Sequence, residues 1–112
     1  MTRDDVEAAA LALPAATRIV QWGGSDVYKV GGKVFAICGL GGGLSFKVTE
    51  IGFMALTEGG PGRQAPYLAR GHWVAVELDE LEAREVADWL ATSHSLVAAK
   101  LTRVQKRELG LA

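Results

Sequence analysis

The stretch DVYKVGGKVFAI, residues 26–37, decides the fold of this chain. Two runs rich in β-branched and aromatic residues, 26–30 and 33–37, flank the pair Gly31-Gly32. A two-glycine loop between such runs is a strong hairpin signal, because both turn positions of the favoured turn need a positive φ angle. The stretch therefore predicts a β-hairpin with its turn at residues 31 and 32.

Similar runs on both sides extend this hairpin. Residues 19–22 form a short run before it, and residues 44–48 alternate between apolar and polar side chains after a glycine-rich connection. Together these segments predict an antiparallel meander of about four strands. Residues 73–78, with the sequence WVAVEL, predict a further strand.

Helical patterns surround the strands. Thr2 with Asp5, and Thr102 with Gln105, resemble capping boxes at helix starts, and Asp79 is expected to cap another helix. The predicted helices span residues 2–13, 49–56, 79–91, 93–101 (starting at Ser93 or Ser95) and 102–110. Because helices and strands do not alternate regularly, the order predicts an α+β fold.

Size and composition bound the class of protein. With 112 residues, the chain is expected to form a single domain, residues 1–112. An apolar content of 49% and a net charge of -1 exclude a disordered chain. No apolar run reaches the roughly 18 residues of a membrane span, and the single Cys38 cannot form an internal disulfide. The acidic N-terminus lacks the basic start of a secretory signal, so we expect a cytoplasmic protein with no membrane partner.

The charge is segregated along the chain although it nearly cancels overall. Residues 17–75 carry six basic and three acidic side chains, and residues 76–92 carry one basic and six acidic ones. Residues 93–112 carry four basic side chains and one acidic side chain. A basic face is therefore compatible with a nearly neutral protein. The simpler interpretation is that these charges cover solvated helix faces.

Patterns typical of catalysis or metal binding are weak. Cys38, His72 and His94 lie far apart along the chain, whereas a zinc site needs three or four ligands with close pairs. We expect His72 at the start of a strand and His94 at the start of a helix. The glycines at 39 and 41–43 lack the Gly-Lys-Ser/Thr ending of a phosphate loop. We expect no enzyme activity, cofactor or metal; a small-ligand or enzymatic site beneath the long loop at 58–72 is an alternative.

Basic side chains in two parts of the chain are candidates for contacts with phosphate. Two lysines flank the predicted turn at residues 31 and 32, and a third lies in the next strand. Three more basic residues share one face of the last predicted helix by their i, i+3, i+4 spacing. Such side chains neutralise phosphates without reading sequence. The six predicted contacts are Lys29, Lys33, Lys47, Arg103, Lys106 and Arg107.

An ordered set of motifs resembles the MmcQ/YjbR family. The residues that carry the resemblance are LP at 13–14, QWG at 21–23, VYKVGGKVFA at 27–36, LSFK at 44–47, APY at 65–67, HWVAV at 72–76, WL at 89–90, SHSLV at 93–97 and KL at 100–101. The resemblance implies a two-layer α+β fold similar to CyaY (frataxin-like), with an antiparallel sheet of five to six strands covered by helices on one side. It also implies DNA binding by hairpins in a double-wing arrangement. The family usually has Ser-Tyr where this chain has Ser93-His94.

The resemblance and the basic residues together predict a non-enzymatic protein that binds double-stranded DNA. The alternative is a protein-interaction or self-associating module. A small domain that is 49% apolar can leave apolar surface exposed, which would suit a homodimer or another protein partner.

Overall fold

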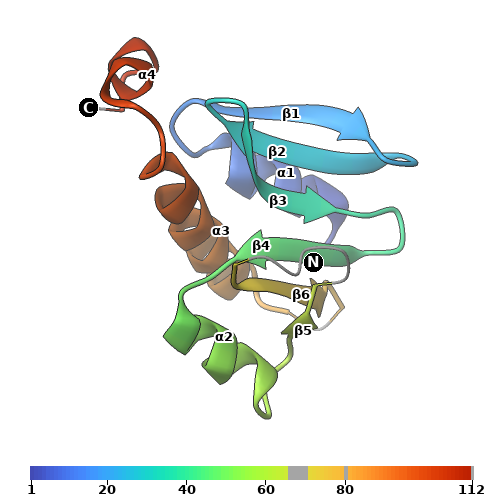
Figure 1. Ribbon diagram of the computed structural model, residues 1–112. Coiled ribbons are helices and arrows are strands. Elements are labelled where there is room, and N and C mark those ends of the chain that lie inside the picture. Colours follow the sequence, from blue (N-terminus) through green and yellow to red (C-terminus); the bar gives the residue numbers. More distant parts are fainter. Residues whose placement is uncertain (66–70, 80, 112) are drawn as a thin grey trace.

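The computed structural model describes residues 1–65, 71–79 and 81–111 (Figure 1). The helices are α1 (Arg3–Leu11), α2 (Glu50–Thr57), α3 (Ala83–Ala98) and α4 (Arg103–Glu108). The strands are β1 (Ala16–Gln21), β2 (Ser25–Val30), β3 (Lys33–Cys38), β4 (Gly43–Lys47), β5 (Arg63–Gln64) and β6 (Trp73–Glu77). Within the described ranges, none of the helices combines the length and the apolar character that crossing a bilayer requires.

The described strands form one antiparallel sheet in the order β1-β2-β3-β4-β6-β5. Next to the edge strand β1 is the hairpin of β2 and β3, in which Gly31 and Gly32 have φ angles of 58° and 79°. These left-handed angles favour glycine over any residue with a Cβ atom. The predicted hairpin and its turn are therefore confirmed. The register shifts between Tyr28 and Lys29, so that Phe35 on β3 has no residue directly opposite it on β2.

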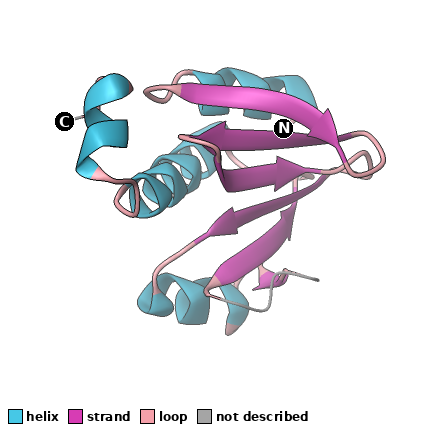
Figure 2. Ribbon diagram, turned by 45° about the horizontal axis from the view of Figure 1, so that its top comes forward, coloured by secondary structure: helices cyan, strands magenta, loops and turns pink. Residues whose placement is uncertain are grey.

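The helices and the sheet form two layers (Figure 2). α3 packs across β3 and β4, and α1 packs against α3 and the sheet. α2 contributes Phe53 and Leu56 to the same core at the β6 side. Buried side chains such as Tyr28, Phe46 and Leu90 fill the space between the layers. The predicted α+β fold, with an antiparallel sheet covered by helices on one side, is confirmed.

Helices α1 and α4 each begin with the predicted capping box. The Thr2 hydroxyl accepts a hydrogen bond from the Asp5 amide at 3.2 Å, and the Asp5 carboxylate accepts one from the Thr2 amide at 2.9 Å. Thr102 and Gln105 make the same reciprocal pair at 3.1 and 3.0 Å. Both pairs satisfy amides that a helix start leaves without intrahelical partners.

α3 is one continuous helix where the sequence predicted two. The expected break near Ser93 is absent because this side chain faces the sheet and bonds to strand backbone, so it does not cap a new helix. The predicted start was also wrong: the N-cap is Glu82 rather than Asp79, and no side chain caps it. His94 consequently lies within α3, about one turn before its end, and not at a helix start.

The predicted loop at 58–71 contains the short strand β5. Arg63 and Gln64 pair with Ala75 and Val74 at the edge of the sheet. Residues 66–70 lie outside the described residues, and with them two residues of the APY motif and the basic residue at position 70. The alternative site beneath residues 58–72 therefore lies partly outside the described residues.

Candidate nucleic-acid interface

The turn of the β2–β3 hairpin packs against the segment that leads into α4. A Cβ atom at Gly31 would lie 2.6 Å from Cδ2 of Leu101, so the glycine backbone lies directly against this leucine. Leu101 is itself buried and belongs to the core between the layers. Figure 1 shows α4 at the same end of the molecule as the turn. The contact therefore brings together two basic segments that are far apart in the sequence.

Five of the six predicted contacts lie on these two segments. On the hairpin, Lys33 is exposed and Lys29 is half-buried. On α4, Arg103 and Arg107 are exposed, whereas Lys106 is half-buried. The three basic residues of α4 are thus not equally accessible, although their spacing places them on one side of the helix.

The sixth predicted contact, Lys47, ends β4 at the point where β3 and β4 separate (Figure 2). The ladder between the two strands stops at the pair Ala36–Phe46. Beyond it, the Ser93 hydroxyl of α3 occupies the position of the next strand-to-strand contact. It accepts a hydrogen bond from the Lys47 amide at 2.8 Å and donates one to the Phe35 carbonyl at 2.6 Å. A helix side chain therefore joins the two strands where their own pairing ends.

The Lys47 side chain lies beside Lys100, just after the end of α3. Lys100 follows Ser93 by about two helical turns, which places both residues on the same side of this segment. A hydrogen-bonding interaction with Lys100, then partial burial and the positive charge of Lys100, lower the pKa of Lys47. Lys47 therefore has a second basic residue as its neighbour near the split between β3 and β4.

Other basic side chains are neutralised within the fold. Asp26 is buried and binds the guanidinium groups of Arg3 at 2.8 Å and Arg18 at 2.7 Å. Arg63 binds Glu77 at 3.1 Å. In contrast, the residues that gather near the hairpin turn and α4 have no acidic partner among the described residues. We call this group the basic end; its members are Lys29, Lys33, Lys47, Lys100, Arg103, Lys106 and Arg107.

Acidic side chains gather at the other end of α3. Glu82, Glu85 and Asp88 are exposed at its beginning, whereas Lys100 follows its last turn. This order suits the helix dipole, which favours anions at the N-terminus and cations at the C-terminus. The charge segregation read along the sequence is therefore also a segregation in space along α3.

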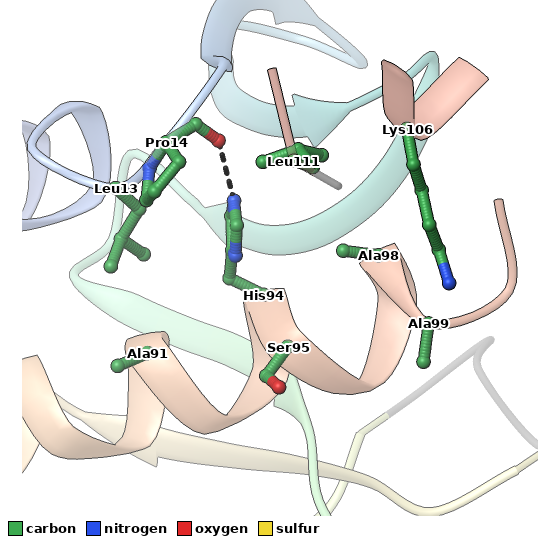
Figure 3. Close-up of a pocket in the computed structure, with 9 residues that line it drawn as sticks. All are labelled: Leu13, Pro14, Ala91, His94, Ser95, Ala98, Ala99, Lys106 and Leu111. Atoms are coloured by element: carbon green, nitrogen blue, oxygen red, sulfur yellow. Dashed lines mark hydrogen bonds between the residues drawn. The ribbon is translucent and has the colours of Figure 1, made fainter. Parts of the chain in front are cut away.

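A groove of about 420 Å³ runs between the end of α1, α3 and the C-terminal segment (Figure 3). Its described lining is mainly apolar, and Lys106 lies along one side. His94 is buried here, with its Nε2 atom 2.7 Å from the Pro14 carbonyl oxygen and its ring edge-on to Phe35. Position 94, where the resembling family usually has tyrosine, thus contributes to packing between α1 and α3.

The described residues contain no group of three or more His, Cys, Asp or Glu side chains placed to hold a metal ion. Cys38 is buried in the core, and burial raises the pKa of its thiol. A thiol held in the neutral form is a poor nucleophile.

Comparison with known proteins identifies the family. The YjbR family model matches residues 11–96, which is most of the chain. This chain belongs to the YjbR family. The YjbR-family chain is also similar to the crystal structure of the Deinococcus radiodurans protein DR2400, which contains the domain DUF419. The two are 28% identical with a TM-score of 0.87, over 99% of this chain and 89% of that chain. A search of curated proteins found no match.

The family match divides the basic end of this YjbR-family protein into two parts. Lys29, Lys33 and Lys47 lie within residues 11–96, whereas Lys100 and all of α4 follow the matched region. The likeness to DR2400, however, covers nearly the whole chain. The C-terminal basic segment is therefore part of the shared fold even though the family model ends before it.

Lys100 was not among the six contacts predicted from the sequence. Its position beside Lys47 depends on Ser93 pointing at the sheet and on α3 continuing unbroken past this residue. The sequence contains no signal for either feature, because a serine in a helix usually faces solvent or caps a terminus.

Proposed function

We propose that this YjbR-family protein binds the phosphate backbone of double-stranded DNA through its basic end, without catalysing a reaction. The observation that carries the proposal is the packing of Gly31 against Leu101. It gathers the hairpin lysines and the α4 arginines at one end, where no described acid is paired with them. In the double-wing arrangement that the family resemblance implies, the β2–β3 hairpin is a wing that meets the DNA.

The charge distribution sets the expected strength of binding. The net charge is -1, and the acids of α3 lie away from the basic end. Phosphate contacts made by Lys and Arg release counterions from DNA and do not distinguish sequences. We therefore expect modest affinity, little base preference and strong dependence on salt.

Fluorescence anisotropy of a labelled duplex with 5′-hydroxyl ends, measured at several salt concentrations, tests the proposal. With about four to six phosphate contacts, log K should fall against log salt with a slope of roughly -4 to -5. No binding at low salt would overturn the proposal.

Charge-reversal variants test whether the basic end is the surface that binds DNA. The double variant Lys33→Glu/Arg103→Glu should abolish binding at moderate salt, since it reverses charge on both the hairpin and α4. Arg84→Glu is the control, because Arg84 is an exposed basic residue near the acidic start of α3. Equal losses of DNA affinity in the double variant and in Arg84→Glu would show that overall charge, and not the basic end, determines binding.

A second candidate function is self-association through β1. β1 lies at the edge of the sheet, and its Ile19 and Val20 side chains are 46% and 54% exposed. Trp22, directly after the strand, is 63% exposed. Arg18, the one charged residue of this strand, is held by Asp26. An apolar edge strand without protecting charges readily pairs with another strand.

Sedimentation velocity tests this candidate. The wild-type chain should form a dimer at micromolar concentrations, and Val20→Lys should return it to a monomer by placing a charge on the edge. Val104→Lys is the control, since Val104 is a similarly exposed valine on α4. A monomeric wild-type protein at all concentrations would rule out this function.

A further inference from the structure

Strand β1 lies at one edge of the sheet and has a left-handed residue at each end (Figure 1). Ala15, directly before the strand, has a φ angle of 57°, and Trp22, directly after it, has one of 50°. Among the described residues, no other residue with a Cβ atom has a positive φ angle. This conformation is unfavourable for such residues, and outliers of this kind cluster at functional sites.

The side chains of β1 alternate between the two faces of the sheet. Arg18 lies on the face that the helices cover, because its guanidinium binds Asp26 and comes within 3.9 Å of Glu7 on α1. Successive side chains of a strand point to opposite faces. Val20 therefore shares the helix-covered face with Arg18, and Ile19 lies on the opposite face. Each face thus carries one exposed apolar side chain of β1.

The outer edge of β1 is complementary to a second copy of itself. A two-fold axis perpendicular to the sheet joins two such strands antiparallel and keeps the helices of both copies on the same side. Residues that lie opposite each other then share a face. When Ile19 lies opposite the partner's Ile19, the two exposed isoleucines meet, and Val20 lies opposite the partner's Arg18, whose guanidinium is held by Asp26.

The two neighbouring registers are less favourable. Pairing Arg18 with the partner's Arg18 places like charges directly opposite each other, which is destabilising. Pairing Val20 with the partner's Val20 leaves residues 19–21 of the strand in the ladder, whereas the register centred on Ile19 pairs residues 17–21. The longer ladder and its apolar centre favour the register centred on Ile19.

Trp22 extends this contact beyond the end of the strand. In the register centred on Ile19, Trp22 lies opposite the partner's Ala16, the first residue of its β1. The small alanine side chain leaves room for the exposed indole ring. Aromatic side chains supply much of the binding energy of protein interfaces, and the two-fold symmetry makes this contact twice.

The same register determines where the two basic ends lie. Within one copy, the turn at residues 31 and 32 lies beside the start of β1, because Ala16 pairs with Val30. The two β1 strands run antiparallel, so the start of one lies beside the end of the other. The two basic ends consequently lie at opposite ends of the joined strands.

We infer that two copies of this chain join through β1 in the register centred on Ile19, and that the dimer bridges two DNA duplexes. The inference rests on the proposed function, because one basic end holds each duplex. It adds an activity that neither candidate function has alone, since a monomer has one basic end and a dimer without DNA binding has no duplex to join.

Single cysteines test the register. Ile19→Cys should form a disulfide-linked dimer when oxidised with diamide, because opposite Cα atoms are about 4.5–5.5 Å apart, within the reach of a disulfide. Thr17→Cys is the matched control, an exposed position on the same face of β1. It lies opposite the partner's Gln21 and therefore too far from the partner's Thr17 to cross-link. The native Cys38 is buried.

Capture of a second duplex tests the bridging. Streptavidin beads that carry a biotinylated duplex are incubated with micromolar protein and a free fluorescent duplex. The wild-type chain should retain at least tenfold more fluorescence than Val20→Lys, which disrupts the pairing of β1 and leaves the basic end intact. In anisotropy, Val20→Lys should bind a single duplex as well as the wild type does, which also shows that the variant folds.

The outcomes separate the inference from the proposed function. A wild-type dimer that binds one duplex and captures no second one overturns the bridging and leaves both candidate functions standing. Cross-linking at Thr17→Cys but not at Ile19→Cys overturns the register. A monomeric wild type overturns the inference and leaves DNA binding intact. If no duplex binds in anisotropy, DNA binding and bridging are both wrong, and the disulfide at position 19 still tests the dimer.

Discussion

Gly31 lies directly against the side chain of Leu101, so that the hairpin turn and the segment before α4 are in contact only because position 31 has no side chain. A Cβ atom there would lie 2.6 and 2.8 Å from the two Cδ atoms of Leu101. A Cβ atom at Gly32, the other turn residue, would have no atom within 4 Å. The two glycines therefore share a backbone requirement but differ in packing.

The first prediction uses this difference. Gly32→Ala should destabilise the protein by about 1–2 kcal/mol, because it forces a Cβ into the left-handed region. Gly31→Ala should cost about 1–3 kcal/mol more, since Leu101 must also move. Thermal or denaturant unfolding of the two variants measures both values. Equal losses would show that the hairpin does not depend on its contact with Leu101.

The second prediction concerns Ser93. Ser93→Ala leaves the Lys47 amide and the Phe35 carbonyl without their hydrogen-bond partner at the split between β3 and β4. Since each buried polar group left unsatisfied costs roughly 1–3 kcal/mol, we expect a loss of about 2–4 kcal/mol in unfolding free energy. Ser95→Ala, an exposed position on the same helix, is the control and should change stability by less than about 0.5 kcal/mol. A neutral Ser93→Ala would mean that the split closes and the strands pair directly.

The third prediction is alkaline destabilisation that depends on Tyr28. Burial, followed by the negative charge of Asp26, raises the pKa of Tyr28 from 10.0 to about 12. The contribution of this group is fully present below pH 10 and is lost as the pH rises toward 12, since the unfolded chain ionises first. Burial raises the pKa of Cys38 in the same direction. The free energy of unfolding should therefore fall across this range.

Tyr28→Phe isolates the tyrosine contribution. Its fall in unfolding free energy above pH 10 should be shallower than that of the wild type, because the contributions of Cys38 and Lys47 are common to both proteins. At pH 7 the variant should be as stable as the wild type or up to about 1 kcal/mol more stable. The reason is that the buried Tyr28 hydroxyl has no hydrogen-bond partner among the described residues. If the unfolding free energies of the wild type and of Tyr28→Phe fell in parallel above pH 10, the alkaline destabilisation would not come from Tyr28.

The fourth prediction ranks two lysines of the basic end. Lys33 is exposed on the hairpin, whereas Lys106 is half-buried along the groove beside His94. Lys33→Gln should make the slope of log K against log salt shallower by about 1, which is the change expected for one lost phosphate contact. Lys106→Gln should reduce it by less than half as much. A larger effect at Lys106 would place the groove, and not the hairpin, against the DNA.

Local signals predicted local structure well. The glycine pair at 31 and 32 predicted the β2–β3 hairpin, and Thr2 and Thr102 predicted two helix starts, because each of these features depends on neighbouring residues alone. Family motifs then supplied the layer arrangement. Five of the six predicted phosphate contacts lie on the hairpin and α4, and whether any of the six touches DNA stays a prediction.

The errors arose where a tertiary contact outweighs a local preference. Ser93 has the residue type of a cap but serves as a bridge between strands, so an unbroken helix was predicted as two. Asp79 has the residue type of an N-cap, yet α3 begins after Glu82. β5 pairs with β6 from within a glycine- and proline-rich loop, where strand propensity is low. The position of Lys100 near Lys47 depends on all of α3 and could not be predicted from the sequence spacing.

The bridging role of Ser93 restricts what evolution can place at position 93. The side chain must be small enough to lie between a helix and two strands, and its one polar atom must both donate and accept. Only serine meets this demand with ease, and threonine does so where its methyl group finds room. A hydroxyl residue within the long helix, with buried apolar side chains about one turn before and after it, should therefore mark relatives whose sheets are divided in the same way, even after their surface charges have diverged.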